Sequence, residues 1–332
     1  MKLFFPLLLC TTLAIVSCGA GSTKKSSNTL DVAASPSYDA DSAYRFVREQ
    51  TEFGPRVPGT KAHAACKNYM AQKMTQFGAK TSLQDCTVKM WDGSSLAATN
   101  IIASYFPEKT RRILLCAHWD SRPWADHDPD PAKHRDPVMG ANDGASGVGV
   151  LMEIARQLQQ ASTKGNEPAY GVDIVFFDAE DLGTPTFAEA ETQGDFWCLG
   201  TKYWAKEAKA TGYKAEFGIL LDMVGGTSPT FMWEYFSNQY APTYLQKVWS
   251  AASKLGYARM FVSAQGGSIT DDHLPVNQIA GIPCIDIIDY NPASPTGFVP
   301  YWHTTHDTMD KIDKSSLKAV GETLMSLLFP TE

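Results

Sequence analysis

The sequence has 332 residues and a formal net charge of −7 at neutral pH, and it contains no run of basic residues. This charge balance argues against nucleic acid as a partner. Seven cysteines occur, but no CxxC or Cys/His spacing is present, which argues against a thiolate metal site. The roughly 300 residues after the N-terminal leader slightly exceed the usual size of one domain and remain within reach of a single α/β domain.

The first residues predict an exported protein. An apolar stretch at 3–16 is too short and too early for a stable membrane-spanning helix, so we expect a signal peptide over residues 1–17. It ends in "IVSC", which resembles the bacterial lipobox; the alternative is an ordinary signal peptide with an incidental cysteine. Residues 18–38 are small and polar and indicate a flexible tether. We therefore expect a periplasmic lipoprotein anchored at Cys18, and we place it at the outer membrane because Gly19 is not the Asp associated with inner-membrane retention.

Helix and strand patterns alternate from Asp39 onward. Helical periodicity covers 42–53 and 60–77, on either side of the loop "GPRVPGT". Further helices are expected at 144–160, 201–210, 242–255 and 315–329, and strands at 100–105, 112–117, 172–177, 218–221 and 282–288. The short apolar runs are typical of strands buried on both faces. The alternation predicts one α/β domain over residues 39–332, built around a largely parallel sheet.

Histidine and carboxylate side chains follow four of the expected strands. They are His118 and Asp120, then Glu180 and Asp181, then Asp222, and finally His303, His306 and Asp307; Asp143 precedes the helix expected from 144. Each residue alone has a simpler interpretation, such as a buried structural histidine or, for Asp143, a helix N-cap. Because the carboxyl ends of parallel strands meet at one edge of a sheet, however, we expect these side chains to converge. Histidine and carboxylates without thiolate suit a catalytic zinc that keeps one position open.

Six motifs in the chain resemble, in their order, those of a known enzyme superfamily. They are "GPRVPGT", "AHWD", "GANDGASG", "FFDAED", "LLDMVG" and "YWHTTHD". This set is similar to the zinc aminopeptidases of the co-catalytic two-metal type and to their relatives, the animal-type glutaminyl-peptide cyclotransferases (glutaminyl cyclases). The resemblance extends from about Phe53 to the C-terminus and implies a three-layer αβα sandwich around a twisted, mostly parallel mixed sheet.

The two branches of the superfamily imply different metal sites. In the aminopeptidase pattern, His118 and Asp222 would bind one zinc, Asp181 and His303 a second, and Asp143 would bridge them. The cyclase pattern implies one zinc per chain, held by Asp143, Asp181 and His303. All five positions carry a suitable ligand, so the ligands alone leave both possibilities open.

Two other stretches favour the cyclase branch. In "SITDDHLPV", Asp271 matches a residue that supports the cyclase reaction by hydrogen bonding. In "FVPYWH", Trp302 and Phe298 resemble the aromatic walls of the cyclase pocket, to which Ile269 and Met223 would add apolar surface. Plain loop packing is the alternative for Trp302. We therefore expect a zinc-dependent glutaminyl-peptide cyclotransferase that acts on N-terminal Gln of peptides, with a two-zinc aminopeptidase as the alternative and a catalytically inactive binding domain as a third.

The resemblance also implies roles for the remaining carboxylates. Glu180 would carry the proton, and Asp222 and Asp271 would hold the amine and the tetrahedral intermediate by hydrogen bonds. Asp181 departs from the Glu usual at its position, so a bound metal would sit closer to the backbone. For Asp178 the sequence leaves two interpretations open, a partner that orients a neighbouring ligand or a simple end to the strand. Trp197 either lines the pocket or is buried under the following helix.

Overall fold

The computed structural model describes residues 37–188 and 194–330. The expected signal peptide, the lipobox and nearly all of the tether lie outside the described residues. Tyr38, assigned above to the tether, is buried in the main core, where a Cβ atom on Gly321 would lie 2.1 Å from its ring. The folded domain therefore includes Tyr38. No helix of the described segments is long and apolar enough to cross a membrane.

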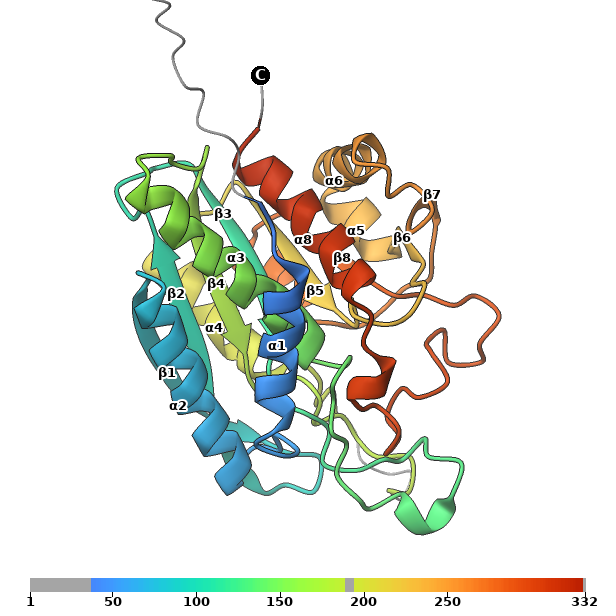
Figure 1. Ribbon diagram of the computed structural model, residues 1–332. Coiled ribbons are helices and arrows are strands. Elements are labelled where there is room, and N and C mark those ends of the chain that lie inside the picture. Colours follow the sequence, from blue (N-terminus) through green and yellow to red (C-terminus); the bar gives the residue numbers. More distant parts are fainter. Residues whose placement is uncertain (1–36, 189–193, 331–332) are drawn as a thin grey trace, which may run out of the picture. The chain divides into compact units, whose positions relative to one another are not determined.

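A six-stranded sheet with the order β1-β2-β4-β3-β5-β8 forms the centre of the domain (Figure 1). Its strands are β1 (Lys80–Lys89), β2 (Ser95–Tyr105), β3 (Arg112–His118), β4 (Gly171–Phe177), β5 (Phe217–Asp222) and β8 (Cys284–Ile288). The four strands β4, β3, β5 and β8 pair in parallel, whereas β2 is antiparallel to both of its neighbours. This arrangement confirms the expected mostly parallel mixed sheet.

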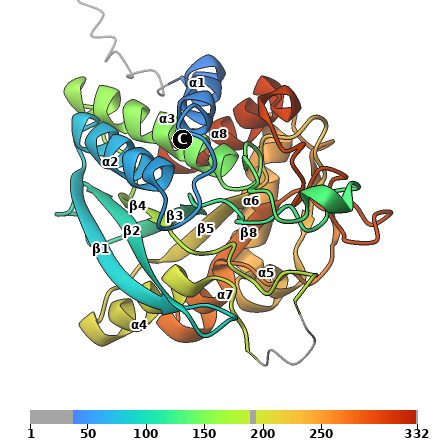
Figure 2. The same cartoon turned by 90° about the horizontal axis from the view of Figure 1, so that it is seen from below.

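Helices cover both faces of the sheet, which confirms the three-layer architecture (Figure 2). On one face lie α1 (Ala40–Thr51), α2 (Lys61–Gln76), α3 (Ala145–Thr163), α6 (Pro242–Lys254) and α8 (Lys314–Leu328). The other face carries α4 (Leu199–Thr211), α7 (His273–Pro275) and the π-helical turn η2 (Val276–Ala280). The remaining elements are α5 (Tyr235–Tyr240), the paired strands β6 (Phe231–Trp233) and β7 (Phe261–Gln265), and the 3-10 turns η1 (Pro131–Lys133) and η3 (Met309–Lys311).

Strand β3 shows why the apolar runs of the sequence form this sheet. Ile113 and Leu115 point into the core beneath α1 and α3, whereas Leu114 and Cys116 point into the core beneath α4. Side chains alternate along a strand, so a strand buried on both faces must be apolar throughout. Cys116 and Cys284 are small core residues, as expected, and all five cysteines of the described segments are free.

Strand β1 was missed by the sequence analysis, together with the first part of β2. Most β1 residues are exposed or half-buried because this strand lies at the edge of the sheet. It therefore lacks the apolar run by which the central strands were recognised. The short parallel pair β6 and β7 was missed as well, since it spans only three and five residues.

The loop "GPRVPGT" owes its place to Arg56, whose side chain is fully buried. Its guanidinium donates to the backbone carbonyls of Trp119, Met139 and Gly140 at 2.9, 2.8 and 2.7 Å. These carbonyls belong to the segment that follows His118 and to the loop that leads to Asp143. Arg56→Met should therefore lower the free energy of unfolding by about 3–5 kcal/mol, because buried acceptors would lose their donors.

Urea denaturation followed by circular dichroism measures this effect. The control is Arg48→Met, which removes an exposed ion pair with Glu52 on α1 and should change stability by about 0.5 kcal/mol or less. Equal effects of the two substitutions would show that the Arg56 network does not hold the loops.

Candidate active site

The candidate site lies at the carboxyl edge of the sheet. Strand β3 ends at His118 and β5 ends at Asp222, while Glu180 and Asp181 lie in the turn after β4, three and four residues beyond its end. Asp143 comes just before α3 but makes no capping hydrogen bond there, because Gly144 occupies the N-cap position. The alternative interpretation of Asp143 as a helix cap is therefore wrong, and its side chain is available to the site.

Asp143, Asp181 and His303 form one compact group of potential metal ligands. His303 Nε2 lies 3.2 Å from Asp181 Oδ1 and 3.5 Å from Asp143 Oδ2. Such separations suit a tetrahedral zinc, for which bonds of about 2.0–2.2 Å place the ligand atoms slightly more than 3 Å apart. All three side chains are buried. The donor set thus fits zinc, and the shorter side chain of Asp181 reaches the group.

His303 is held in the form that a metal ligand requires. Burial and the nearby Arg122 guanidinium lower the pKa of His303 well below its usual value, which favours the neutral imidazole. The ring of Trp302 stacks on it at 3.6 Å, and Trp197 faces it in a near-parallel plane at 6.0 Å. Its backbone has a φ of 54°, a left-handed conformation that is uncommon for a residue with a side chain.

A second group consists of His118, Asp143 and Asp222. His118 Nε2 lies 3.0 Å from Asp143 Oδ1 and 3.3 Å from Asp222 Oδ1. Burial alone would lower the pKa of His118, but its contacts with Asp120, Asp143 and Asp222 together raise it well above the usual value. Gly144 permits this approach, since a Cβ atom there would lie 2.9 Å from His118 Cε1. Both ligand groups implied by the two-metal pattern are therefore assembled.

Glu180 lies beside these ligands in an environment that changes its pKa. Burial raises the pKa of Glu180 well above its usual value, and the charges of Asp271 and Asp181 add to this effect although His118 opposes it. The Cys198 thiol donates a hydrogen bond of 3.3 Å to Glu180 Oε1. A carboxyl group whose pKa is raised can both accept and return a proton near neutral pH.

Several supporting carboxylates hold the catalytic loops in place. Asp120 accepts hydrogen bonds from the backbone N–H groups of Glu180 and Asp181 at 3.1 and 3.2 Å. Asp307 accepts from the N–H groups of Asn142 and Asp143 at 2.8 and 3.0 Å. The sequence analysis singled out Asp120 and Asp307 without giving them a role. His306, which followed the same expected strand, is exposed and does not join the site.

Arg122 was missed by the sequence analysis. It is buried, pairs with Asp126 through two contacts of 2.7 and 2.8 Å, and reaches Asp181 Oδ1 at 3.2 Å. Its guanidinium lies 5.5 Å from the ring of Trp124 and 5.0 Å from that of Trp197. Its partner Asp181 lies 59 residues further along the chain, so no local pattern pairs the two. The only sequence feature that could have indicated a role for Arg122 was its place in "HWDSRPWAD", after an expected strand.

Asp178 has a structural role away from the metal ligands. Its carboxylate contacts His63 Nε2 at 3.0 Å and accepts hydrogen bonds from the backbone N–H groups of Thr99 and Ala179 at 2.6 and 2.8 Å. Ala179 adopts a φ of 56°, which starts the sharp turn that carries Glu180. Of the two interpretations left open, the structure therefore favours the end of the strand.

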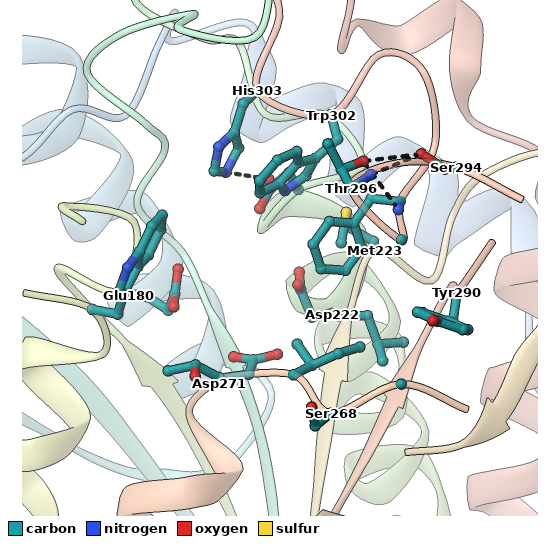
Figure 3. Close-up of a pocket in the computed structure, with 18 of the residues that line it drawn as sticks. Glu180, Asp222, Met223, Ser268, Asp271, Tyr290, Ser294, Thr296, Trp302 and His303 are labelled. Atoms are coloured by element: carbon teal, nitrogen blue, oxygen red, sulfur yellow. Dashed lines mark hydrogen bonds and ion pairs between the residues drawn. The ribbon is translucent and has the colours of Figure 1, made fainter. Parts of the chain in front are cut away.

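A pocket of about 530 Å³ opens above these carboxylates (Figure 3). All four apolar residues expected to line it do so, namely Trp302, Phe298, Ile269 and Met223, together with Ile288 and Tyr290. Trp197 lines it as well, which decides between the two interpretations of that residue. Asp271 reaches the same pocket. Burial raises the pKa of Asp271 well above the usual value, and the negative charge of Asp222 raises it further. Within the described residues, Asp271 Oδ2 has no hydrogen-bond partner.

Comparison with known proteins gives the family. Residues 100–328 match peptidase family M28. The chain belongs to this family. Two solved structures are similar over 90% of this chain: a Zn-dependent exopeptidase of Parabacteroides distasonis (52% identity, 100% of that chain, TM-score 0.86) and the glutaminyl cyclase of Tannerella forsythia (53% identity, 100% of that chain, TM-score 0.85). These matches confirm the family resemblance and the fold expected from the six motifs.

Curated relatives represent both branches of the family. An aminopeptidase of Bacillus subtilis is 26% identical over 76% of this chain, but the match spans only 48% of that protein. The bovine glutaminyl-peptide cyclotransferase is 24% identical over 81% of this chain and 76% of its own length. M28 membership, the Zn-dependent relative and the donor set described above together support zinc as the metal.

Proposed function

We propose that this chain is a zinc-dependent glutaminyl-peptide cyclotransferase, which converts the N-terminal Gln of peptides to pyroglutamate and releases ammonia. One observation carries the proposal: the carboxyl of Glu180 and the ligands Asp143 and His303 line a single pocket walled by Trp302 and Phe298. A carboxyl group that can transfer a proton, two of the proposed metal ligands and an apolar wall thus line the same pocket. The glutaminyl cyclases among the similar solved structures support the same assignment.

We propose one zinc per chain, held by Asp143, Asp181 and His303. When bound there, zinc acts as a Lewis acid that makes the γ-carbonyl carbon of glutamine electrophilic and stabilises the oxyanion. His118 would donate to Asp143 and Asp222, in keeping with its 3.0 and 3.3 Å contacts, instead of binding a second metal. Arg122, at 3.2 Å from Asp181 Oδ1, would fix the orientation of that ligand.

Glu180 would move the proton in this reaction. It accepts a proton from the α-amine of the substrate as the nitrogen attacks the γ-carbonyl carbon and closes a five-membered lactam. It then returns the proton to the departing amide nitrogen, which leaves as ammonia. The bond between the γ-carbonyl carbon (Cδ of glutamine) and that nitrogen breaks, while the new bond between the same carbon and the α-nitrogen is retained, so no water is consumed.

The pocket would hold the substrate in its reactive shape. Asp222 and Asp271 offer carboxylate oxygens to the amine and to the tetrahedral intermediate. The rings of Trp302 and Phe298 lie 4.7 Å apart and confine the flexible glutamine side chain. Confinement in a folded, near-attack conformation lowers the entropic part of the barrier.

A coupled ammonia assay on the zinc-loaded full chain tests this proposal. A Gln-initiated peptide should release ammonia, and the same peptide with an acetylated α-amine should release none, because the amine is the nucleophile. Release from the acetylated peptide would mean that water attacks the side-chain amide, and the proposed cyclisation would be wrong.

A two-zinc aminopeptidase is the second candidate. The observation in its favour is the convergence of His118, Asp143 and Asp222 as a second ligand group. Two zinc ions per chain together with free amino acids from Leu-initiated peptides would support it.

We also propose that the protein is exported and lipid-anchored at Cys18, on the outer membrane and facing the periplasm. The support is the "IVSC" motif and the absence of Asp at position 19. Cys18→Ser should move the protein from the membrane fraction to the soluble fraction of a cell extract.

A further inference from the structure

The pocket is larger than one glutaminyl residue needs. Its volume of about 530 Å³ falls within the range of roughly 300–1,000 Å³ typical of sites for drug-sized ligands. Figure 3 shows Glu180 and His303 on one side of it, Tyr290 and Ser294 on the opposite side, and Trp302 between them. We call the side away from the acids the loop-side lobe; it is lined by Gly267, Ser268, Tyr290, Ser294, Thr296 and Gly297.

Two glycines allow the backbone to pack closely against the Tyr290 ring in this lobe. A Cβ atom on Gly267 would lie 2.7 Å from the Tyr290 ring, and one on Gly297 would lie 2.8 Å from it. Gly297 also has a φ of 81°, which disfavours any other residue there. The Tyr290 backbone is fixed by a hydrogen bond from its N–H to the carbonyl of Thr230 at 3.1 Å. Both glycines approach Cε2 of the ring, so the half-buried ring packs against two backbone segments at the pocket wall.

The loop that closes the lobe is ordered by its own hydrogen bonds. The N–H of Asn291 donates to the carbonyl of Gly297 at 2.7 Å, and the N–H of Gly297 donates to the carbonyl of Ser294 at 3.1 Å. The hydroxyls of Ser294 and Thr296 lie 3.0 Å apart. The lobe is therefore a shaped surface before substrate arrives, and shaping in advance reduces the entropic cost of binding.

The chemistry of the substrate directs its second residue toward this lobe. Both the α-amine and the γ-carbonyl of glutamine must face Glu180 and the metal ligands. The α-carbonyl, which carries the rest of the peptide, therefore points away from them. The lobe offers an aromatic ring and hydroxyl groups, and among the described residues that line the pocket there is no Lys or Arg.

We propose that the loop-side lobe is the subsite for the second residue of the peptide, and that Tyr290 makes it select an aromatic or aliphatic side chain over an acidic one. This inference rests on the proposed cyclase function. The apolar surface of the half-buried Tyr290 ring, which packs with Met223, Ile269 and Ile288, supplies the attraction. An acidic side chain would lose water without gaining a cationic partner, while Glu180, Asp222 and Asp271 line the same pocket.

Steady-state kinetics with three amidated dipeptides test the subsite on the zinc-loaded full chain. Gln-Phe-amide should have a kcat/KM about tenfold or more above that of Gln-Glu-amide. Tyr290→Ala should lower kcat/KM for Gln-Phe-amide about tenfold and that for Gln-Gly-amide less than about twofold. Tyr290→Phe should keep the selectivity, because no hydrogen bond of the described residues involves the Tyr290 hydroxyl. Tyr203→Ala, on the exposed side of α4, is the matched control and should leave kcat/KM unchanged for both substrates.

If Tyr290→Ala lowered kcat/KM equally for Gln-Phe-amide and Gln-Gly-amide, the proposal would be overturned, since Tyr290 would then act on the glutamine itself or on the fold. A binding measurement separates this outcome from failure of the proposed function. Calorimetry on the zinc-loaded Glu180→Gln variant, with and without Tyr290→Ala, gives the affinity for the same dipeptides without turnover. A preference for Phe over Gly that Tyr290→Ala abolishes would support the subsite even if the wild-type protein released no ammonia; the absence of any preference would contradict it.

Discussion

Glu180→Gln should reduce kcat for ammonia release about 10³-fold or more while leaving the zinc content unchanged. The amide has nearly the shape of the carboxyl and can still contact the Cys198 thiol, which lies 3.3 Å from Glu180 Oε1. It cannot accept the proton of the attacking amine, so the loss corresponds to about 4 kcal/mol of transition-state stabilisation. Steady-state kinetics and metal analysis of the purified variant measure both quantities.

Glu207→Gln is the matched control, because Glu207 is exposed on α4 and should not affect turnover. Loss of zinc from Glu180→Gln would show that the roles of Glu180 and Asp181 are reversed. Activity near the wild-type level would exclude Glu180 as the proton carrier.

His303→Ala should remove both the zinc and the activity. It deletes one of only three proposed protein ligands and leaves Asp143 and Asp181, two buried carboxylates, facing each other without a neutral partner. We expect kcat/KM to fall about 10³-fold or more, as for other changes that remove a catalytic metal. Metal analysis by mass spectrometry after dialysis, together with the ammonia assay, measures these effects.

His118→Gln is the informative counterpart, since His118 belongs only to the second ligand group. Its side chain can still donate to Asp143 or Asp222, which His118 Nε2 contacts at 3.0 and 3.3 Å. If the site binds one zinc, the wild-type protein should hold one ion per chain and His118→Gln should retain it. A wild-type protein with two zinc ions, of which His118→Gln loses one, would favour the aminopeptidase instead.

The sequence was sufficient to predict the central strands of the sheet, their mostly parallel direction and the edge where the site lies. The information came from buried parallel strands, whose apolar runs end at polar residues such as His118, Glu180 and Asp222. A central strand must be apolar on both faces, so the change from apolar to polar residues shows where it ends. Strand β1 has no continuous apolar run, because it lies at the edge of the sheet and most of its residues are exposed or half-buried.

Residues whose place depends on contacts between distant loops could not be predicted in this way. Arg122 lies against Asp181, yet no local pattern links the two residues. Asp271, which lies near Glu180 and Cys198, was predicted only through the resemblance of "SITDDHLPV" to a cyclase segment. Tyr290 acquires its position from Gly267 and Gly297, which approach its ring from two different segments. Periodicity reports which face of an element is buried, whereas these contacts depend on how irregular loops fold over the strand ends.

The most direct test of cyclisation is the mass of the product. The zinc-loaded full chain is incubated with a Gln-initiated peptide, and the peptide is then analysed by mass spectrometry. Cyclisation predicts a single product that is lighter by one ammonia, resists further N-terminal degradation and keeps every peptide bond. Free glutamine together with a peptide shortened by one residue would contradict the account and identify an aminopeptidase.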